Sequence, residues 1–351
     1  MRSTWNRLVE RGQFIGGGEV ESFETEFASF IGSAHCAGVA NGTDAITLSL
    51  RALGAGPRAE IVIPAMTFFA TVEAVLHSGA TPVFADVAPD SLTISPEEVA
   101  KCVGERTVGV VGVHLYGHPF DLDAIGTFCE SRGLWYLEDA AQAQGAKWNG
   151  TRVGSFGVAA GWSFYPSKNL GCFGDGGAVT SDSPGLISEI RHFGNHGQSG
   201  RSWHDRWGCN SRLDALQAAV LRVRLLELDA QNERRRVIAG RYRRGLAECR
   251  QIRMLEEDSR AEPVYHQFVI LTSERSRLAE FLAKSEIATA VHYPHPVHAQ
   301  PILDKPLPLD ACPVAKSAAE QLLSLPMFPT LADDQVDYVC EQIRRFFGVP
   351  C

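Results

Sequence analysis

Residues 108–139, VGVVGVHLYGHPFDLDAIGTFCESRGLWYLED, contain the pattern that identifies the fold. Residues 108–113 and 134–137 are apolar runs of strand length, and residues 122–132 between them have a helical pattern. A helix that connects two buried strands is typical of parallel pairing. This segment therefore predicts a strand–helix–strand unit of a parallel sheet.

The same alternation extends toward the N-terminus. Residues 61–63 and 82–84 are predicted strands, and residues 67–77 and 95–103 are predicted helices. We therefore expect an α/β protein whose mostly parallel sheet is flanked by helices.

The pattern changes toward the C-terminus. Residues 213–245 predict one long helix, because apolar side chains recur at the spacing of a single buried face. The side chains that form this face are Leu216, Ala219, Val220, Val223 and Leu226. A strand-like segment at 265–271 and a proline-rich segment at 293–313 follow, as in a smaller α+β unit. We predict a large domain of residues 1–235 and a small domain of residues 236–351.

Residues 163–182, SFYPSKNLGCFGDGGAVTSD, present one lysine, Lys168, between an apolar run at 158–162 and a glycine-rich exit. This arrangement predicts a turn over the core. A lysine partly removed from water loses some preference for its ammonium form, and the neutral amine can attack a carbonyl to form a Schiff base. Lys168 is thus a candidate attachment point for an aldehyde cofactor, although a solvated loop lysine is the alternative reading.

Two further segments also indicate a site for an aldehyde cofactor. Asp139 ends the apolar run 133–139, and ligands collect at the carboxyl ends of parallel strands. Its carboxylate could pair with the cationic ring nitrogen of pyridoxal phosphate, with Gln142 near the ring hydroxyl. The segment Asn41-Gly42-Thr43-Asp44 precedes a helical pattern at 45–53, where free N–H groups favour a phosphate. The alternative interpretation, both for Asp139 and for the segment that begins at Asn41, is a helix N-cap.

The chain resembles pyridoxal-phosphate nucleotide-sugar aminotransferases of the DegT/StrS group, which have the fold type I architecture of aspartate aminotransferase. The similarity covers nearly the whole chain. Besides the lysine segment, the matching segments are residues 14–32, 40–54, 62–87, 113–125, 137–146, 208–225, 291–301 and 324–331.

The resemblance implies roles for residues that bind the cofactor. Lys168 would form the covalent bond, Asp139 would pair with the ring nitrogen, and Gln142 would lie against the ring oxygen. Phe68 would stack on the opposite face of the ring.

The remaining roles concern the phosphate and the substrates. Gly42, Thr43 and Ser163 would hold the phosphate together with Asn210 of a partner subunit, so the resemblance implies a homodimer with shared active sites. Arg212 would lie near the carboxylate of the amino-acid donor. The sugar-nucleotide side would be lined by His292 and Tyr293.

The implied reaction is a transamination in two half-reactions, in which an amino acid, usually glutamate, donates its amino group to a nucleotide-linked keto sugar. Relatives with histidine in place of the lysine are dehydratases, whereas this chain has Lys168. Residues 196–201, 210–225 and 289–296 look closer to enzymes that aminate C-3 than to those that aminate C-4. The product would be an amino sugar for glycan or natural-product biosynthesis, with UDP or dTDP as the nucleotide.

Two other classes of function remain alternatives. A non-catalytic regulator that binds pyridoxal phosphate would use the same Lys168 and Asp139. A nicotinamide oxidoreductase is disfavoured, because the spacing from Tyr165 to Lys168 is one residue shorter than the Y-x-x-x-K pair and no G-x-G-x-x-G follows the first strand.

Amino-acid composition narrows the possible classes of function further. The 351 residues are 45% hydrophobic and 21% charged, with a net charge of −8, which argues against nonspecific nucleic-acid binding. A basic cluster remains, which we interpret as a solvated helix face; it contains Arg234, Arg235, Arg236, Arg241, Arg243 and Arg244.

Nine cysteines without a C-x-x-C pair fit a reducing compartment and give no support for a metal. No segment resembles a secretion signal or a membrane span, so we expect a cytoplasmic protein.

Overall fold

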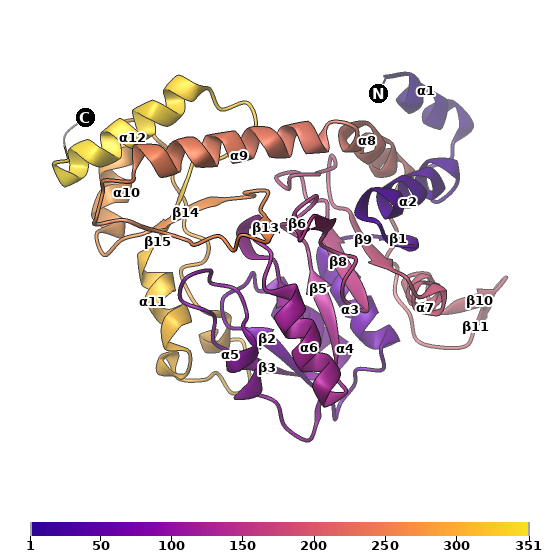
Figure 1. Ribbon diagram of the computed structural model, residues 1–351. Coiled ribbons are helices and arrows are strands. Elements are labelled where there is room, and N and C mark those ends of the chain that lie inside the picture. Colours follow the sequence, from indigo (N-terminus) through magenta and orange to yellow (C-terminus); the bar gives the residue numbers. More distant parts are fainter. Residues whose placement is uncertain (1, 350–351) are drawn as a thin grey trace.

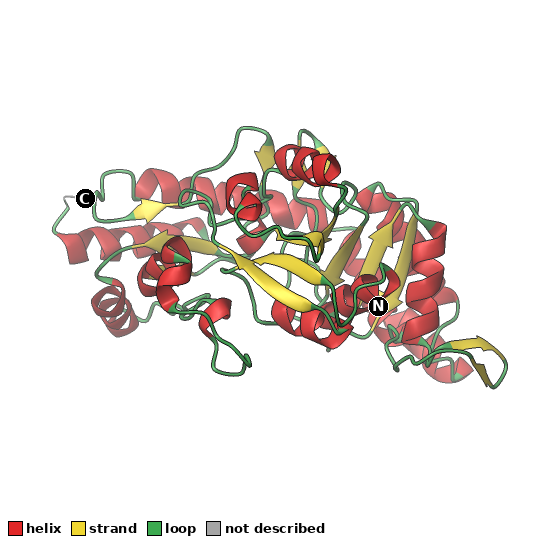
Figure 2. Ribbon diagram, turned by 90° about the horizontal axis from the view of Figure 1, so that it is seen from below, coloured by secondary structure: helices red, strands yellow, loops and turns green. Residues whose placement is uncertain are grey.

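The computed structural model describes residues 2–349 and is built around one seven-stranded sheet (Figures 1 and 2). In spatial order its strands are β1 (His35–Val39), β9 (Gly177–Ser181), β8 (Ala159–Ser163), β5 (Trp135–Asp139), β4 (Thr107–Val113), β2 (Glu60–Pro64) and β3 (Thr81–Ala85). The pairings from β8 to β3 are parallel, whereas β9 is antiparallel to both β8 and β1. The predicted α/β fold with a mostly parallel sheet is confirmed.

Helices cover both faces of this sheet, because successive strand residues point to opposite sides. Ile61 packs in one core cluster, beneath α3 (Gly42–Ala52), α4 (Ala70–Ser78) and α7 (Pro184–Gly194). Its neighbour Val62 packs in the other, beneath α2 (Gly18–Ile31), α6 (Leu122–Arg132) and α8 (Ala215–Leu225). Both faces of the strands are therefore apolar, as expected of a buried parallel sheet.

A smaller unit forms on the C-terminal side, around an antiparallel sheet of β12 (Arg253–Met254), β14 (Phe268–Leu271) and β15 (Leu322–Leu325). The helices of this part are α9 (Leu228–Gly245), α10 (Arg275–Lys284), α11 (Pro313–Gln321) and α12 (Asp333–Phe347). Ile238 on α9, Ile270 on β14 and Ile343 on α12 share a separate core cluster. The domain boundary between residues 235 and 236 stays a prediction, because α9 runs through it without a break.

The other elements are short. They are α1 (Arg2–Arg11), α5 (Pro96–Ala100), β6 (Lys147–Trp148), β7 (Thr151–Arg152), β10 (Gln198–Gly200), β11 (Trp203–His204), β13 (Ala261–Glu262) and the 3₁₀ turns Leu115–Gly117, Val297–Ala299 and Leu309–Ala311. The hairpin of β10 and β11 projects away from the sheet (Figure 1). No helix within residues 2–349 has both the length and the apolar character needed to cross a membrane.

The prediction of one helix over residues 213–245 is wrong. The structure has two helices, α8 and α9, separated at Leu226 and Glu227. The side chain of Leu226 is 87% exposed, so it does not belong to the buried face that its spacing predicted. The two helices pack against different partners, α8 against α2 and α9 against α12.

Candidate active site

The carboxyl ends of two neighbouring strands form the floor of the candidate site. Asp139 is the last residue of β5 and Ser163 is the last residue of β8, and the two strands pair in parallel. The chain then turns, with the Lys168 N–H donating to the Tyr165 carbonyl over 2.8 Å. A cavity of about 350 Å³ lies over this edge of the sheet. Nine of the predicted site residues line it: Gly42, Thr43, Phe68, Asp139, Gln142, Ser163, Lys168, His292 and Tyr293.

Asp139 is a buried carboxylate with a dedicated donor on α4. Thr71 Oγ1 donates to Asp139 Oδ2 over 2.8 Å, and the Ala141 N–H donates to Oδ1 over 3.2 Å. Burial raises the pKa of Asp139, and these two hydrogen bonds oppose that rise without cancelling it. A cationic ring nitrogen beside this carboxylate would supply the charge that favours its ionised form.

Lys168 is partly buried, and its loss of hydration favours the neutral form of the side chain, whereas burial of Asp139 favours the neutral carboxyl. Loss of hydration lowers the pKa of its ammonium group to about 8, although the nearby Asp139 carboxylate raises the pKa in part. A substantial fraction of the amine is therefore neutral near physiological pH. Such an amine is chemically able to attack an aldehyde and to move protons.

The N-terminus of α3 provides an anion site at the end of the cavity. Asn41 caps the helix by accepting from the Asp44 N–H over 2.8 Å, while the first N–H groups of a helix lack intrahelical partners. A Cβ on Gly42 would lie 2.7 Å from Ser163 Cβ, so only glycine lets the helix start so close to the end of β8. The backbone at the start of α3 therefore lies close to the end of β8. We call this place the phosphate cradle, because its N–H groups suit a phosphate.

The side chain of Gln142 is held between two tyrosines. Its Oε1 accepts from the Tyr116 N–H over 2.6 Å, and its Nε2 donates to Tyr293 Oη over 3.1 Å. Tyr293 also faces Phe68, with 5.6 Å between the ring centroids. Phe68 is 54% exposed although it lines the cavity, so it presents an uncovered aromatic ring to whatever binds there.

Asn210 and Arg212 lie outside this cavity. Asn210 is exposed and pairs with Asn195 through an isolated β-bridge. Arg212 Nη1 donates to Asn195 Oδ1 over 3.1 Å and lines a different hollow, together with Ser211 and Gln198. Within one subunit, neither residue reaches the group around Lys168.

Several residues of the cavity were not predicted from the sequence. Thr71 had a local signal, since it lies four residues after Thr67 in the predicted helix 67–77; in the structure Thr67 precedes α4, and the two hydroxyls lie 2.9 Å apart. His266 and Gln267 had none, because they come from the C-terminal part of the chain and meet Lys168 only in the folded molecule.

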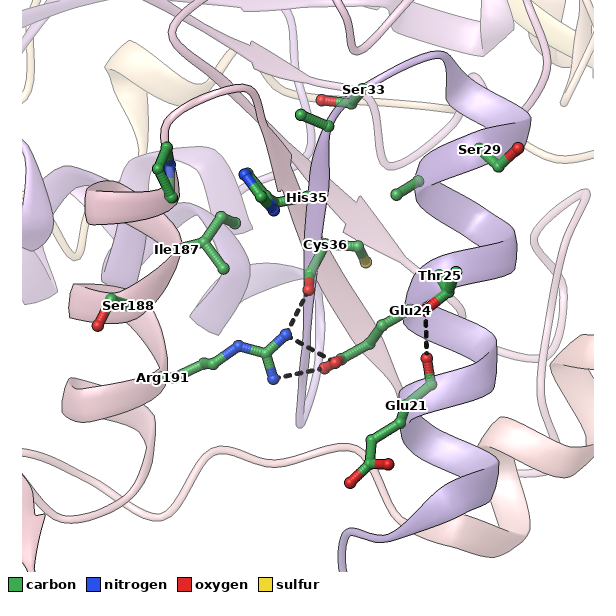
Figure 3. A pocket seen from close by; sticks show the side chains of 13 residues that line it. Glu21, Glu24, Thr25, Ser29, Ser33, His35, Cys36, Ile187, Ser188 and Arg191 are labelled. Carbon is green, nitrogen blue, oxygen red and sulfur yellow. Dashed lines mark hydrogen bonds and ion pairs between the residues drawn. The ribbon is translucent and has the colours of Figure 1, made fainter.

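A larger hollow between α2, α7 and β1 has different chemistry (Figure 3). Glu24 on α2 accepts from Arg191 on α7, with 2.7 Å between Oε2 and Nη2. Arg191 also donates to the Cys36 carbonyl over 2.7 Å, and the Gly38 N–H donates to Glu24 over 2.6 Å. These charged groups satisfy one another, and none of the predicted site residues lies there.

Comparisons with known proteins agree with this chemistry. The sequence model of the DegT/DnrJ/EryC1/StrS aminotransferase family matches residues 2–344. The chain is 42% identical over 341 residues to a dTDP-3-amino-3,4,6-trideoxy-alpha-D-glucose transaminase of Streptomyces venezuelae, covering 97% of this chain and 90% of that protein. It is 40% identical over 346 residues to a pleiotropic regulatory protein of Geobacillus stearothermophilus, covering 97% and 93%.

A solved structure shows the same fold. The crystal structure of S. venezuelae DesV in complex with a ketimine intermediate superposes with a TM-score of 0.96 at 42% identity, covering 98% of this chain and 93% of that one.

Proposed function

This chain belongs to the DegT/DnrJ/EryC1/StrS aminotransferase family, and on that premise we propose that it transfers the amino group of L-glutamate to the C-3 carbonyl of a nucleotide-linked keto sugar, with pyridoxal phosphate as cofactor. The observation that supports this most is the shared cavity of Lys168, Asp139 and the start of α3. These groups match the aldehyde, the ring nitrogen and the phosphate of one cofactor.

The cofactor supplies, when bound, an aldehyde that exchanges amines and a ring that withdraws electrons from the substrate carbon. Asp139 would hold the proton on the ring nitrogen. The N–H groups of Gly42 and Thr43, with Ser163, would bind the phosphate, and Phe68 would cover one face of the ring. Gln142 would lie against the ring oxygen.

Lys168 has two tasks in this proposal. Its amine would attach the cofactor, and once displaced by the donor it would take the proton from the donor α-carbon and later return one to C-3 of the sugar. Its lowered pKa supports this role, because only the neutral amine accepts a proton.

Asn210 and Arg212 fit this site only if a second subunit contributes them. We propose a homodimer in which both residues, two positions apart, reach the cavity of the partner. His292 and Tyr293 of the same subunit would then face the sugar nucleotide from the other side.

The nearest competing function is regulation. One relative is named as a pleiotropic regulatory protein, so a chain of this family could bind the cofactor without aminating a sugar.

Single-turnover absorbance separates these functions. Glutamate should convert the absorbance of the lysine-bound cofactor to that of its amine form, and a 3-keto sugar linked to dTDP or UDP should restore it. Restoration by 4-keto sugars alone would support C-4 amination. A spectrum that no sugar in the panel restores would support the regulator.

A further inference from the structure

His266 occupies the wall between two hollows. It lines the active-site cavity with Lys168, and it also lines a neighbouring hollow of about 250 Å³ that includes Ser324 and Met327. The side chain is partly buried, and no residue within 2–349 forms a hydrogen bond with its Nε2. One ring nitrogen therefore remains available to a ligand.

A series of hydrogen-bonded amides determines which ring nitrogen of His266 is available. Asn232 on α9 donates through Nδ2 to the Gln144 carbonyl over 2.8 Å, so its Oδ1 must be the acceptor on the other side. Asn169 donates through Nδ2 to that Oδ1 and to the Val264 carbonyl, each over 2.9 Å. Carbonyl oxygens only accept, so the orientation of both amides is defined.

The imidazole of His266 is the next group in this series of hydrogen bonds, after Asn169. Its Nδ1 lies 3.2 Å from Asn169 Oδ1, which accepts, so Nδ1 must carry the hydrogen. Burial lowers the pKa of His266 well below its usual value, and the charge of Lys168 lowers it further, so the ring is neutral. In this tautomer Nε2 is a hydrogen-bond acceptor.

We propose that His266 is a specificity-determining residue that accepts a hydrogen bond, through Nε2, from a ring hydroxyl of the sugar substrate. The inference rests on the proposed function. A hydroxyl that leaves water needs an acceptor in the site, and the neighbouring Gln142 amide already bonds Tyr116 and Tyr293. Glutamate has no hydroxyl, so His266 matters in the sugar half-reaction alone.

Two variants test this. In His266→Asn, an amide nitrogen can replace Nδ1 and keep the bond to Asn169, but the acceptor at Nε2 is lost. In His266→Gln, the amide oxygen can reach the position of Nε2. We expect His266→Asn to slow the sugar half-reaction about 10-fold and to leave the glutamate half-reaction within about 2-fold of wild type, and we expect His266→Gln to recover most of the loss.

Substrate analogues identify the hydroxyl. The probes are a dTDP-linked 3-keto-6-deoxyhexose, which has ring hydroxyls at C-2 and C-4, and its 2-deoxy and 4-deoxy analogues. One analogue should react about 10-fold more slowly with the wild type, and His266→Asn should show no further loss with that analogue.

The possible outcomes separate the two proposals. Equal loss in both half-reactions, or losses from variant and analogues that simply add, would overturn the role of His266 and leave the transaminase proposal intact. A wild type that reacts with glutamate but neither with these sugars nor with UDP-linked 3-keto sugars would overturn the proposed C-3 substrate, and the role of His266 with it.

Discussion

At the scale of single residues, Lys168 shows how one cavity sets the chemistry of an amine. Burial removes water from its ammonium group and lowers the pKa to about 8, whereas the Asp139 carboxylate raises the pKa in part. The ammonium form dominates below this pKa and the neutral amine above it. Reactivity of the cofactor-free protein toward pyridoxal phosphate must therefore rise with pH in this range.

We expect the rate of cofactor uptake to rise with pH through a midpoint near 8 rather than through the usual lysine value, about 10.4. In Asp139→Asn the midpoint should move lower, because the carboxylate that favours the ammonium form is gone. Stopped-flow absorbance across pH gives both midpoints. An Asp139→Asn midpoint at higher pH than wild type would contradict the electrostatic account.

Thr71 should matter through Asp139. Its hydroxyl donates to Asp139 Oδ2 and lowers the pKa of a carboxyl that burial raises. Thr71→Val removes that donor, so the carboxyl is less often ionised and we expect the glutamate half-reaction to slow about 10-fold. Thr71→Ser keeps the hydroxyl and should stay close to wild type. Similar rates in both variants would show that the hydrogen bond is not needed.

At the scale of elements, the start of α3 is defined by a close contact with β8. In Gly42→Ala the new methyl group would meet Ser163 at 2.7 Å, so the helix must shift and the phosphate cradle with it. We expect a loss of about 1–3 kcal/mol in the free energy of unfolding, together with weaker binding of pyridoxal phosphate.

Gly18 provides the matched control for that substitution. It is likewise the first residue of a helix, α2, and a Cβ there meets no atom within 4 Å. Gly18→Ala should therefore leave both the urea midpoint and the cofactor affinity near wild type. Equal effects of the two variants would show that a general cost of replacing glycine, not the contact with β8, explains the loss.

The elements differ in how far the sequence predicts them. Helix α6 has the predicted bounds, and β2, β3, β4 and β5 lie within two residues of theirs, because their apolar runs are short and end at polar residues or turns. The break between α8 and α9 was missed, since no glycine or proline marks it. It depends on which distant helix each half packs against.

At the scale of the whole molecule, α9 joins the large sheet to the C-terminal part, and four arginines of its basic cluster form ion pairs. Arg234 and Arg241 form ion pairs with Asp333, and Arg243 pairs with Glu257. Arg236 pairs with Glu233 and Glu262. Arg235, in contrast, is only 6% exposed and donates to the Tyr265 carbonyl over 2.9 Å, so the prediction of a solvated face is wrong for this residue. For the four arginines with acidic partners, the pairing favours a solvated helix face over a nucleic-acid site.

The proposed exchange of Asn210 between subunits makes a prediction about mixed dimers. Lys168→Ala should be inactive, and Asn210→Asp should be weak because its charge repels the phosphate. After unfolding and refolding both variants together in equal amounts, half of the dimers are mixed and each has one intact site, so we expect about a quarter of wild-type activity. No recovery, in a sample shown by size to be dimeric, would place Asn210 outside the partner's site.

The sequence by itself determined the class of fold, the strand ends that bear Asp139 and Ser163, and the candidate cofactor lysine, because these follow from apolar periodicity and from residues adjacent in the chain. Only the tertiary structure decided that Thr71 bonds Asp139 and that His266 meets the Lys168 cavity through Asn169 and Asn232. Those contacts join segments separated by 60 or more positions. Local spacing contains no information about them, since they form only when the sheet, α9 and the C-terminal part pack together.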